Sequence, residues 1–198
     1  MIVYYRIRGE YMRKKDDEKQ RNIKEAVIKL IQEEGFHGTS MSKIAKEAGV
    51  SPATVYIYYE NKEVMLQDIY REYSEEIFSY LLCKINNGMD GQQLIEGLIR
   101  SYYAYINENE EVFNFVEQFS SCPSLASQCE AMKGIHELNE LLDELKEKNI
   151  IRDYRNDTLI AILFSPVKAI AINALRREEE KKILLQEMVR ILQEVLLV

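Results

Sequence analysis

A short apolar stripe, a tight turn and a second helix start place the strongest constraint on how this chain folds. The stripe recurs at helical spacing and consists of Ile44, Ala45 and Ala48. Gly49 ends it, and Ser51-Pro52 starts a second helix, because serine caps a helix and proline suits its first position. The pattern predicts helices over residues 42–48 and 52–58, joined by a tight turn at Gly49 with Val50 in the angle between them.

Helical periodicity extends over most of the chain. Residues 13–34 carry an apolar stripe of period 3.6 that Gly35 ends as a C-cap. Pro166 lies inside one helical pattern, where we expect it to kink the helix or delay its start. Further helices are predicted over residues 62–82, 92–107, 111–120, 124–148, 157–176 and 179–197. With 8 Gly and 3 Pro in 198 residues, an all-β fold with many tight turns is not expected, and we predict an all-α fold.

Charge divides the chain into a basic head and an acidic body. Residues 1–62 carry 12 Lys+Arg and 9 Asp+Glu, whereas residues 63–198 carry 14 and 24, within a net charge of -7. A basic head suits a polyanionic partner. The 3 dispersed cysteines favour a reducing compartment, and we find no signal peptide and no segment apolar enough to span a membrane. We therefore expect a cytoplasmic protein.

The run from Thr39 to Leu66 resembles the DNA-binding domain of the tetracycline-repressor (TetR) family of bacterial regulators. It departs from the common pattern at Ala53, where glycine is usual, and at Tyr59, where phenylalanine is usual. The residues in step with the family are Ser40, Ile44, Ala45, Ala48, Gly49, Val50, Ser51, Tyr56, Tyr58, Lys62 and Glu63. The resemblance implies an N-terminal three-helix helix-turn-helix DNA-binding domain, residues 13–62, and a larger C-terminal helical ligand-binding and dimerisation domain, residues 63–198.

The resemblance also implies which residues contact double-stranded DNA. The recognition helix enters the major groove, and the preceding helix meets the DNA backbone. The groove-facing set is Ser51, Pro52, Ala53 and Thr54; the phosphate-contacting set is Tyr56, Tyr58 and Lys62; the preceding helix contributes Thr39, Ser40, Ser42 and Lys43. The alternative is that both tyrosines are core aromatics and Lys62 is merely solvated. Residues 1–11 are either a minor-groove arm or a segment that frays or packs on the surface.

A small-molecule pocket is implied for the C-terminal domain. Aromatic side chains together with a few polar groups are typical of the lining of such a pocket. The candidates are Tyr102, Tyr103, Phe113, Phe119, Cys129, Met132 and His136. Plain core packing is the alternative for each of them. A metal site of Cys122, Cys129 and His136 is disfavoured, because seven residues of helix span roughly 10 Å and two ligands of one zinc lie within roughly 4 Å. No cofactor and no metal are indicated.

The last two predicted helices carry apolar stripes too broad for one neighbour. In the family such helices form a four-helix homodimer interface, and intramolecular burial is the alternative. We therefore expect a homodimeric repressor that a small-molecule effector releases from a palindromic operator. No nucleophile, phosphate-loop or metalloprotease motif is present, so an enzyme is not expected. The rival interpretation is a helical small-molecule-binding or interaction protein with a degenerate helix-turn-helix.

Overall fold

The computed structural model describes the backbone of residues 2–86, 88–120 and 132–198, and side chains within these ranges from residue 16 onward. Every regular element in the described part of the chain is a helix, and one isolated antiparallel bridge joins Ile151 to Leu197. The all-α prediction is confirmed. No described helix is long and apolar enough to cross a membrane.

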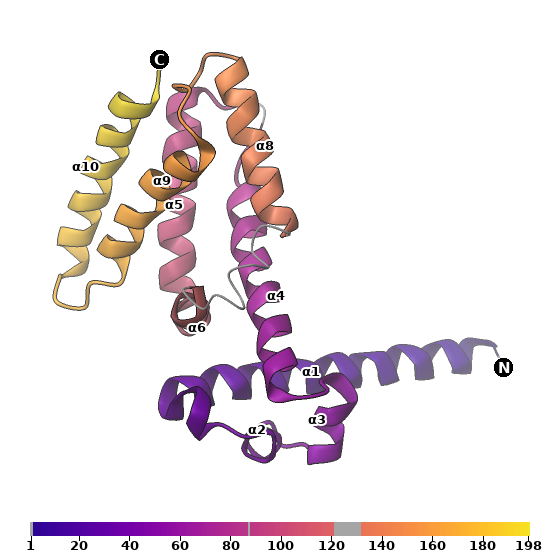
Figure 1. Cartoon of the computed structure of the whole chain (residues 1–198). Helices are drawn as coiled ribbons and strands as arrows, with labels where there is room; N and C mark the ends of the chain where they lie inside the picture. The colour runs from indigo at the N-terminus through magenta and orange to yellow at the C-terminus, as the bar shows by residue number, and fades with distance from the viewer. Residues whose placement is uncertain (1, 87, 121–131) are drawn as a thin grey trace. The chain divides into compact units, whose positions relative to one another are not determined.

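The chain divides into two compact units, and Figure 1 labels the described helices in chain order. One unit comprises Met1–Tyr70 with Asn114–Phe119, and the other comprises Arg71–Phe113 with Ser120–Val198. The first unit therefore contains the whole of the predicted DNA-binding domain. In chain order the helices are α1 (Ile2–Gly38), α2 (Met41–Glu47), α3 (Pro52–Tyr58), α4 (Lys62–Leu82), α5 (Gly91–Glu108), α6 (Glu110–Ser120), α8 (Lys133–Glu147), α9 (Asn156–Ala171) and α10 (Glu178–Leu196).

Helix α1 is longer than its sequence pattern predicts. It already runs from Ile2, so the backbone of residues 2–11 continues the helix. Gly35 breaks the helical geometry with a φ of 71°, a conformation that glycine adopts without steric cost, and residues 36–38 add one more turn. The predicted end of the first stripe at Gly35 is thus confirmed, although the chain does not leave the helix until Gly38.

Helices α2 and α3 form as the sequence predicts. Ser40 caps α2 and Ser51 caps α3, each by accepting a hydrogen bond from the backbone N–H three residues on. Between them Gly49 has a φ of 67°, which closes the tight turn. The buried side chains that pack this pair are Met41, Ile44, Ala45, Ala48, Val55 and Tyr59. Tyr59 stands where phenylalanine is usual in the family and packs inward, since it is 4% exposed.

In the second unit, α5, α9 and α10 pack together through apolar stripes (Figure 1). The buried side chains include Leu98 and Ile99 of α5, Leu163 and Val167 of α9, and Leu192 of α10. Helix α9 runs through Pro166 from its start at Asn156, so the prediction of a later start is wrong. The following turn is reinforced by the buried Nζ of Lys181, which donates to the Ala171 carbonyl at 3.0 Å.

Two predicted helix boundaries differ from the structure. Helix α9 ends at Ala171 rather than at residue 176, because Lys181 and the Ile172 cap satisfy its last carbonyls there. The prediction of one continuous helix over residues 124–148 is wrong, because Met132 is extended and α8 begins at Lys133; residues 124–131 lie outside the described residues. The N-terminus of α8 is capped by Glu75 of α4, whose carboxylate accepts from the backbone N–H of Lys133 at 2.6 Å and of Gly134 at 2.7 Å.

Candidate nucleic-acid interface and candidate pocket

Helix α3 presents an outward face that the rest of its unit leaves uncovered. Val55 is fully buried and anchors the helix, while Tyr56 is 56% and Ile57 is 78% exposed. The predicted groove-facing residues Ser51, Pro52 and Ala53 are exposed, and Thr54 is half-buried. Ile57 was not predicted to contact DNA, although its position along the helix indicates an outward side chain. It lies two residues beyond Val55, which is about 200° around a helix and therefore on the opposite face.

The hydroxyl groups near this face are used for local structure. The Ser51 and Thr54 hydroxyls lie 2.9 Å apart in a hydrogen bond, and Ser51 Oγ also accepts from the Thr54 N–H. Ser40 Oγ accepts from the Lys43 N–H at 3.3 Å, and Ser42 is exposed. These contacts fix the two helix starts that would approach a DNA backbone.

Thr39 differs from the other predicted contacts. Its side chain is 3% exposed, and its hydroxyl donates to the Gly35 carbonyl at 2.9 Å. The hydroxyl therefore bonds the carbonyl of Gly35, the residue that interrupts α1, and does not reach the surface. Any DNA contact of Thr39 would come from its backbone.

Two predicted phosphate contacts, Lys62 and Tyr58, and one residue of the preceding-helix set, Lys43, are hydrogen-bonded within the first unit. Lys62 Nζ donates to the Phe36 carbonyl at 2.8 Å and the Thr39 carbonyl at 3.0 Å, and lies 3.9 Å from the centre of the Phe36 ring. Lys43 Nζ donates to the Glu34 carboxylate and to a backbone carbonyl. An ammonium group has three N–H donors, so each lysine keeps one for another acceptor.

Tyr58 is the third of these residues. Its hydroxyl donates to the Asp16 carboxylate, and this hydrogen bond is the main cause that raises the pKa of Tyr58 to about 12. Desolvation and the negative charge of Asp16 raise the pKa further. A tyrosine has a single O–H donor, so a phosphate contact through this hydroxyl would replace the bond to Asp16.

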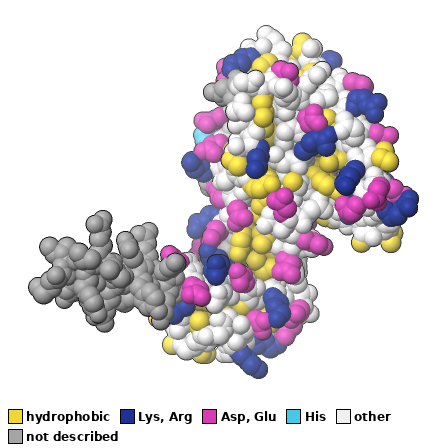
Figure 2. Space-filling view, turned by 180° about the vertical axis from the view of Figure 1, so that it is seen from behind, with side chains coloured by type: hydrophobic (Ala, Val, Ile, Leu, Met, Phe, Trp, Pro, Cys, Tyr) yellow, Lys and Arg dark blue, Asp and Glu magenta, His cyan; other side chains and the backbone are white. Residues whose placement is uncertain are grey.

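The positive charge of the head is concentrated in its first residues. Residues 1–15 carry 5 Lys+Arg and 1 Glu, whereas residues 16–62 carry 7 Lys+Arg and 8 Asp+Glu. On the face in Figure 2, basic and acidic side chains alternate over the coloured, described part, with no broad basic patch. The net positive charge expected to attract a polyanion therefore lies at the start of the chain and not in the helix-turn-helix.

The predicted ligand-binding residues do not converge on one cavity. Tyr102 packs edge-on against Phe113, at 5.9 Å between ring centres, and against Phe164, at 4.9 Å. Phe119 instead packs against Phe115 in the first unit. The remaining described candidates are Tyr103, whose hydroxyl lies 3.4 Å from a Glu178 oxygen, buried Met132 and exposed His136. Cys129 lies outside the described residues.

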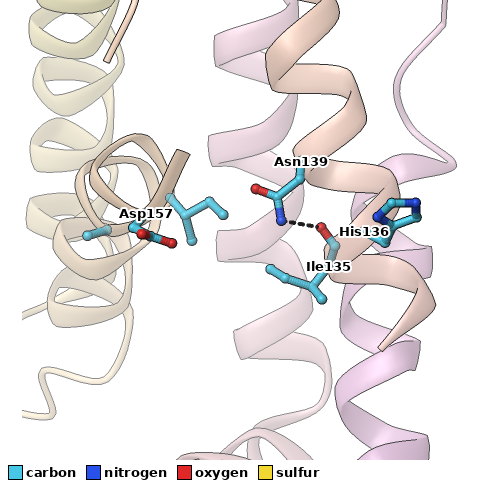
Figure 3. Close-up of a pocket in the computed structure, with 6 residues that line it drawn as sticks. Ile135, His136, Asn139 and Asp157 are labelled. Carbon is cyan, nitrogen blue, oxygen red and sulfur yellow. Dashed lines mark hydrogen bonds between the residues drawn. The ribbon is translucent and has the colours of Figure 1, made fainter. Parts of the chain in front are cut away.

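A groove of about 500 Å³ opens between α8 and α9 of the second unit (Figure 3). It is lined by Ile135, His136, Asn139, Asp157, Ile160 and Ala161. In Figure 3, Asn139 faces α9 and the carboxylate of Asp157, while the His136 ring points away from α9. His136 pairs with Glu140 at 3.2 Å. Of the predicted ligand contacts that the structure describes, only His136 lines this groove, and the apolar walls come from Ile135, Ile160 and Ala161, which were not predicted.

The described residues contain no group of three side chains that could hold a metal ion. Cys122 and Cys129 lie outside the described part of the chain, so the disfavoured metal site is not tested.

Comparison with known proteins identifies the helix-turn-helix. The family model described as "Bacterial regulatory proteins, tetR family" matches residues 23–69. An uncharacterised HTH-type transcriptional regulator of Haemophilus influenzae is 25% identical over 127 residues, covering 62% of this chain and 66% of that protein. The negative transcriptional regulator IcaR of the icaADBC biofilm operon of Staphylococcus epidermidis is 32% identical over 120 residues, covering 60% and 62%. The chain thus spans at most about two thirds of these relatives.

The similarity of fold extends along nearly the whole chain. The crystal structure of a TetR family transcription regulator from Marinobacter aquaeolei VT8 has a TM-score of 0.75 and 26% sequence identity. It covers 90% of this chain, and the match takes in 97% of that chain.

Proposed function

Because the chain belongs to the TetR family of bacterial regulatory proteins, we propose that it is a DNA-binding transcriptional regulator, a repressor that a small molecule releases from a palindromic operator. The observation that carries the proposal is the solvent-exposed outer face of α3. Buried Val55 and Tyr59 anchor this helix from its inner side, and Ser51 caps its start. Repression is supported by the Staphylococcus relative, which is described as a negative regulator. The family is one of regulators, which confirms the prediction that the chain is not an enzyme.

The proposal requires two copies of α3, since a palindrome presents two equivalent half-sites. The partner surface we propose is the outer face of α9 and α10. Ile191 is 50% and Val195 is 45% exposed, and a shallow groove beside them is lined by Ile170, Leu184 and Met188. A symmetric partner would cover this apolar surface with its own copy.

The effector is proposed to act in the second unit, where the α8/α9 groove and the aromatic cluster of Tyr102, Phe113 and Phe164 supply apolar walls. The lever is α4. Its residues up to Tyr70 belong to the first unit and those from Arg71 to the second. Glu75 of α4 caps α8, so a ligand that moves α8 also acts on α4. A coupling of roughly 1–3 kcal/mol changes DNA affinity roughly 5- to 150-fold.

Selection from a random double-stranded DNA library, followed by gel shift, tests the proposal. We expect an enriched inverted repeat with half-sites one helical turn or more apart. Small molecules that raise the melting temperature would then be titrated against the DNA complex. By reciprocity, the operator must weaken effector binding by the same factor that the effector weakens DNA binding. Failure to enrich any sequence would favour the rival interpretation, a helical binding protein with a degenerate helix-turn-helix.

A further inference from the structure

The composition of the α3 surface restricts what it can read. Helix α3, Pro52–Tyr58, contains no Arg, Lys, Asn, Gln, Asp or Glu. Side chains of these types make the hydrogen bonds that identify guanine, adenine or cytosine in the major groove. The helix therefore has no forked donor or acceptor with which to select those bases.

Two of the three side-chain hydroxyls that α3 carries are engaged within the protein. The Ser51 and Thr54 hydroxyls bond to each other, and the Tyr58 hydroxyl donates to Asp16. Val55 is buried, so it has no outward surface to offer. The groups left on the outer face are Tyr56 and the apolar side chains of Pro52, Ala53 and Ile57. The Tyr56 hydroxyl has one O–H donor and lacks the forked geometry that identifies a base, and the family resemblance places it on a phosphate.

Ile57 stands out on this face. It is 78% exposed, far more than the fully buried Val55, and Ala53 lies one helical turn before it. In the major groove, the apolar feature of a base pair is the C5 methyl group of thymine. Packing a methyl against Ile57 removes apolar surface from water on both sides.

We infer that α3 reads the half-site through thymine methyl groups, with Ile57 as the principal specificity-determining residue and Ala53 as its neighbour. The inference rests on the proposed function and names the feature of the DNA that it recognises. Half-sites therefore carry thymine at the base pairs facing Ile57. Their sequence preference depends on shape complementarity to methyl groups rather than on bidentate hydrogen bonds.

Replacing thymine by deoxyuridine tests this directly, because it removes only the C5 methyl. The experiment uses the full-length protein and the operator selected above, with one half-site thymine replaced at a time. At the positions facing Ile57 we expect affinity to fall about fourfold per methyl, the value of one buried methyl-sized group. Deoxyuridine at thymines outside the half-sites serves as the matched control and should have no effect.

Protein variants connect the effect to the residue. Ile57→Ala should bind the thymine and deoxyuridine operators equally, and Ile57→Val should retain part of the difference. Since Ile57 is largely exposed, these variants should melt close to the parent protein. A selected operator whose affinity is unchanged by deoxyuridine at every half-site position overturns the inference while leaving the proposed function intact. Failure to select any operator overturns both.

Discussion

At the scale of single residues, the structure gives several predicted DNA contacts a second role. Lys62 is in step with the family motif, which implies a phosphate contact, yet two of its three donors bond carbonyls of the first unit. Tyr58 likewise bonds Asp16. Both residues thus stabilise the head in the DNA-free protein.

Removing the Lys62 ammonium should therefore destabilise the free protein. In Lys62→Met the apolar stem stays, but the carbonyls of Phe36 and Thr39 lose their donor, at a cost of about 1–3 kcal/mol. Urea unfolding measures the change, with Lys46→Met as control because Lys46 is exposed at the end of α2. Equal midpoints for the two variants would show that Lys62 has no structural role.

The Tyr58–Asp16 hydrogen bond predicts a dependence of stability on alkaline pH. The folded pKa of Tyr58, about 12, lies above the ordinary tyrosine pKa of about 10, so the bond contributes fully below about pH 10 and is lost as the pH rises through about 12. Tyr58→Phe should be less stable than the parent at pH 9, and the difference should shrink by pH 11.5. Other tyrosines with raised pKa are common to both proteins and cancel in the comparison. A difference independent of pH would contradict the assignment.

At the scale of elements, the joint between α4 and α8 depends on a close approach that only glycine permits. A Cβ added to Gly134 would lie 2.4 Å from Phe78 Cβ and 2.9 Å from a Glu75 oxygen. The first of these atoms is fixed to the α4 backbone, so the helices themselves would have to separate. The joint is also where Glu75 caps α8.

Gly134→Ala should thus lower stability by about 1–3 kcal/mol through overpacking. Gly97→Ala is the matched control, since its Cβ would meet only the flexible end of Ile85 at 3.4 Å, and alanine favours a helix interior over glycine by roughly 0.5–1 kcal/mol. Thermal unfolding should move in opposite directions for the two variants. A Gly134→Ala protein as stable as the parent would show that α8 shifts freely on α4.

At the scale of the whole molecule, α10 has two apolar faces with different functions. Its buried face includes Leu185, Val189 and Leu192, and its outer face includes the partly exposed Ile191 and Val195. The first face packs within the chain. The second is the one we propose for the homodimer.

Placing charge on the outer face should produce monomers. Ile191→Glu with Val195→Glu would bury unpaired carboxylates in a dimer interface, while neither residue is needed for the core. Sedimentation equilibrium should show the monomer mass. The control pair Lys182→Gln and Arg190→Gln makes the same change in net charge at exposed positions of α10 and should stay dimeric. A dimer that survives both pairs would rule out this surface.

The sequence by itself determined the helices and most of their ends, because these depend on local chemistry. Ser51-Pro52 begins α3 and Gly49 closes the turn through residues that are neighbours in the chain. Periodicity also identified the buried side of α2. Apolar residues on α10 were recognised as a group, but periodicity alone did not separate Leu192 from Ile191.

Only the tertiary structure decided which side of an apolar helix is covered and which polar groups are already paired. Lys62 and Thr39 bond carbonyls at the end of α1, and the exposure of Ile57 depends on what α3 packs against. Phe119 and Tyr102 belong to different units although both were predicted for one pocket. These properties depend on contacts between residues distant in the chain, so no local sequence pattern predicts them.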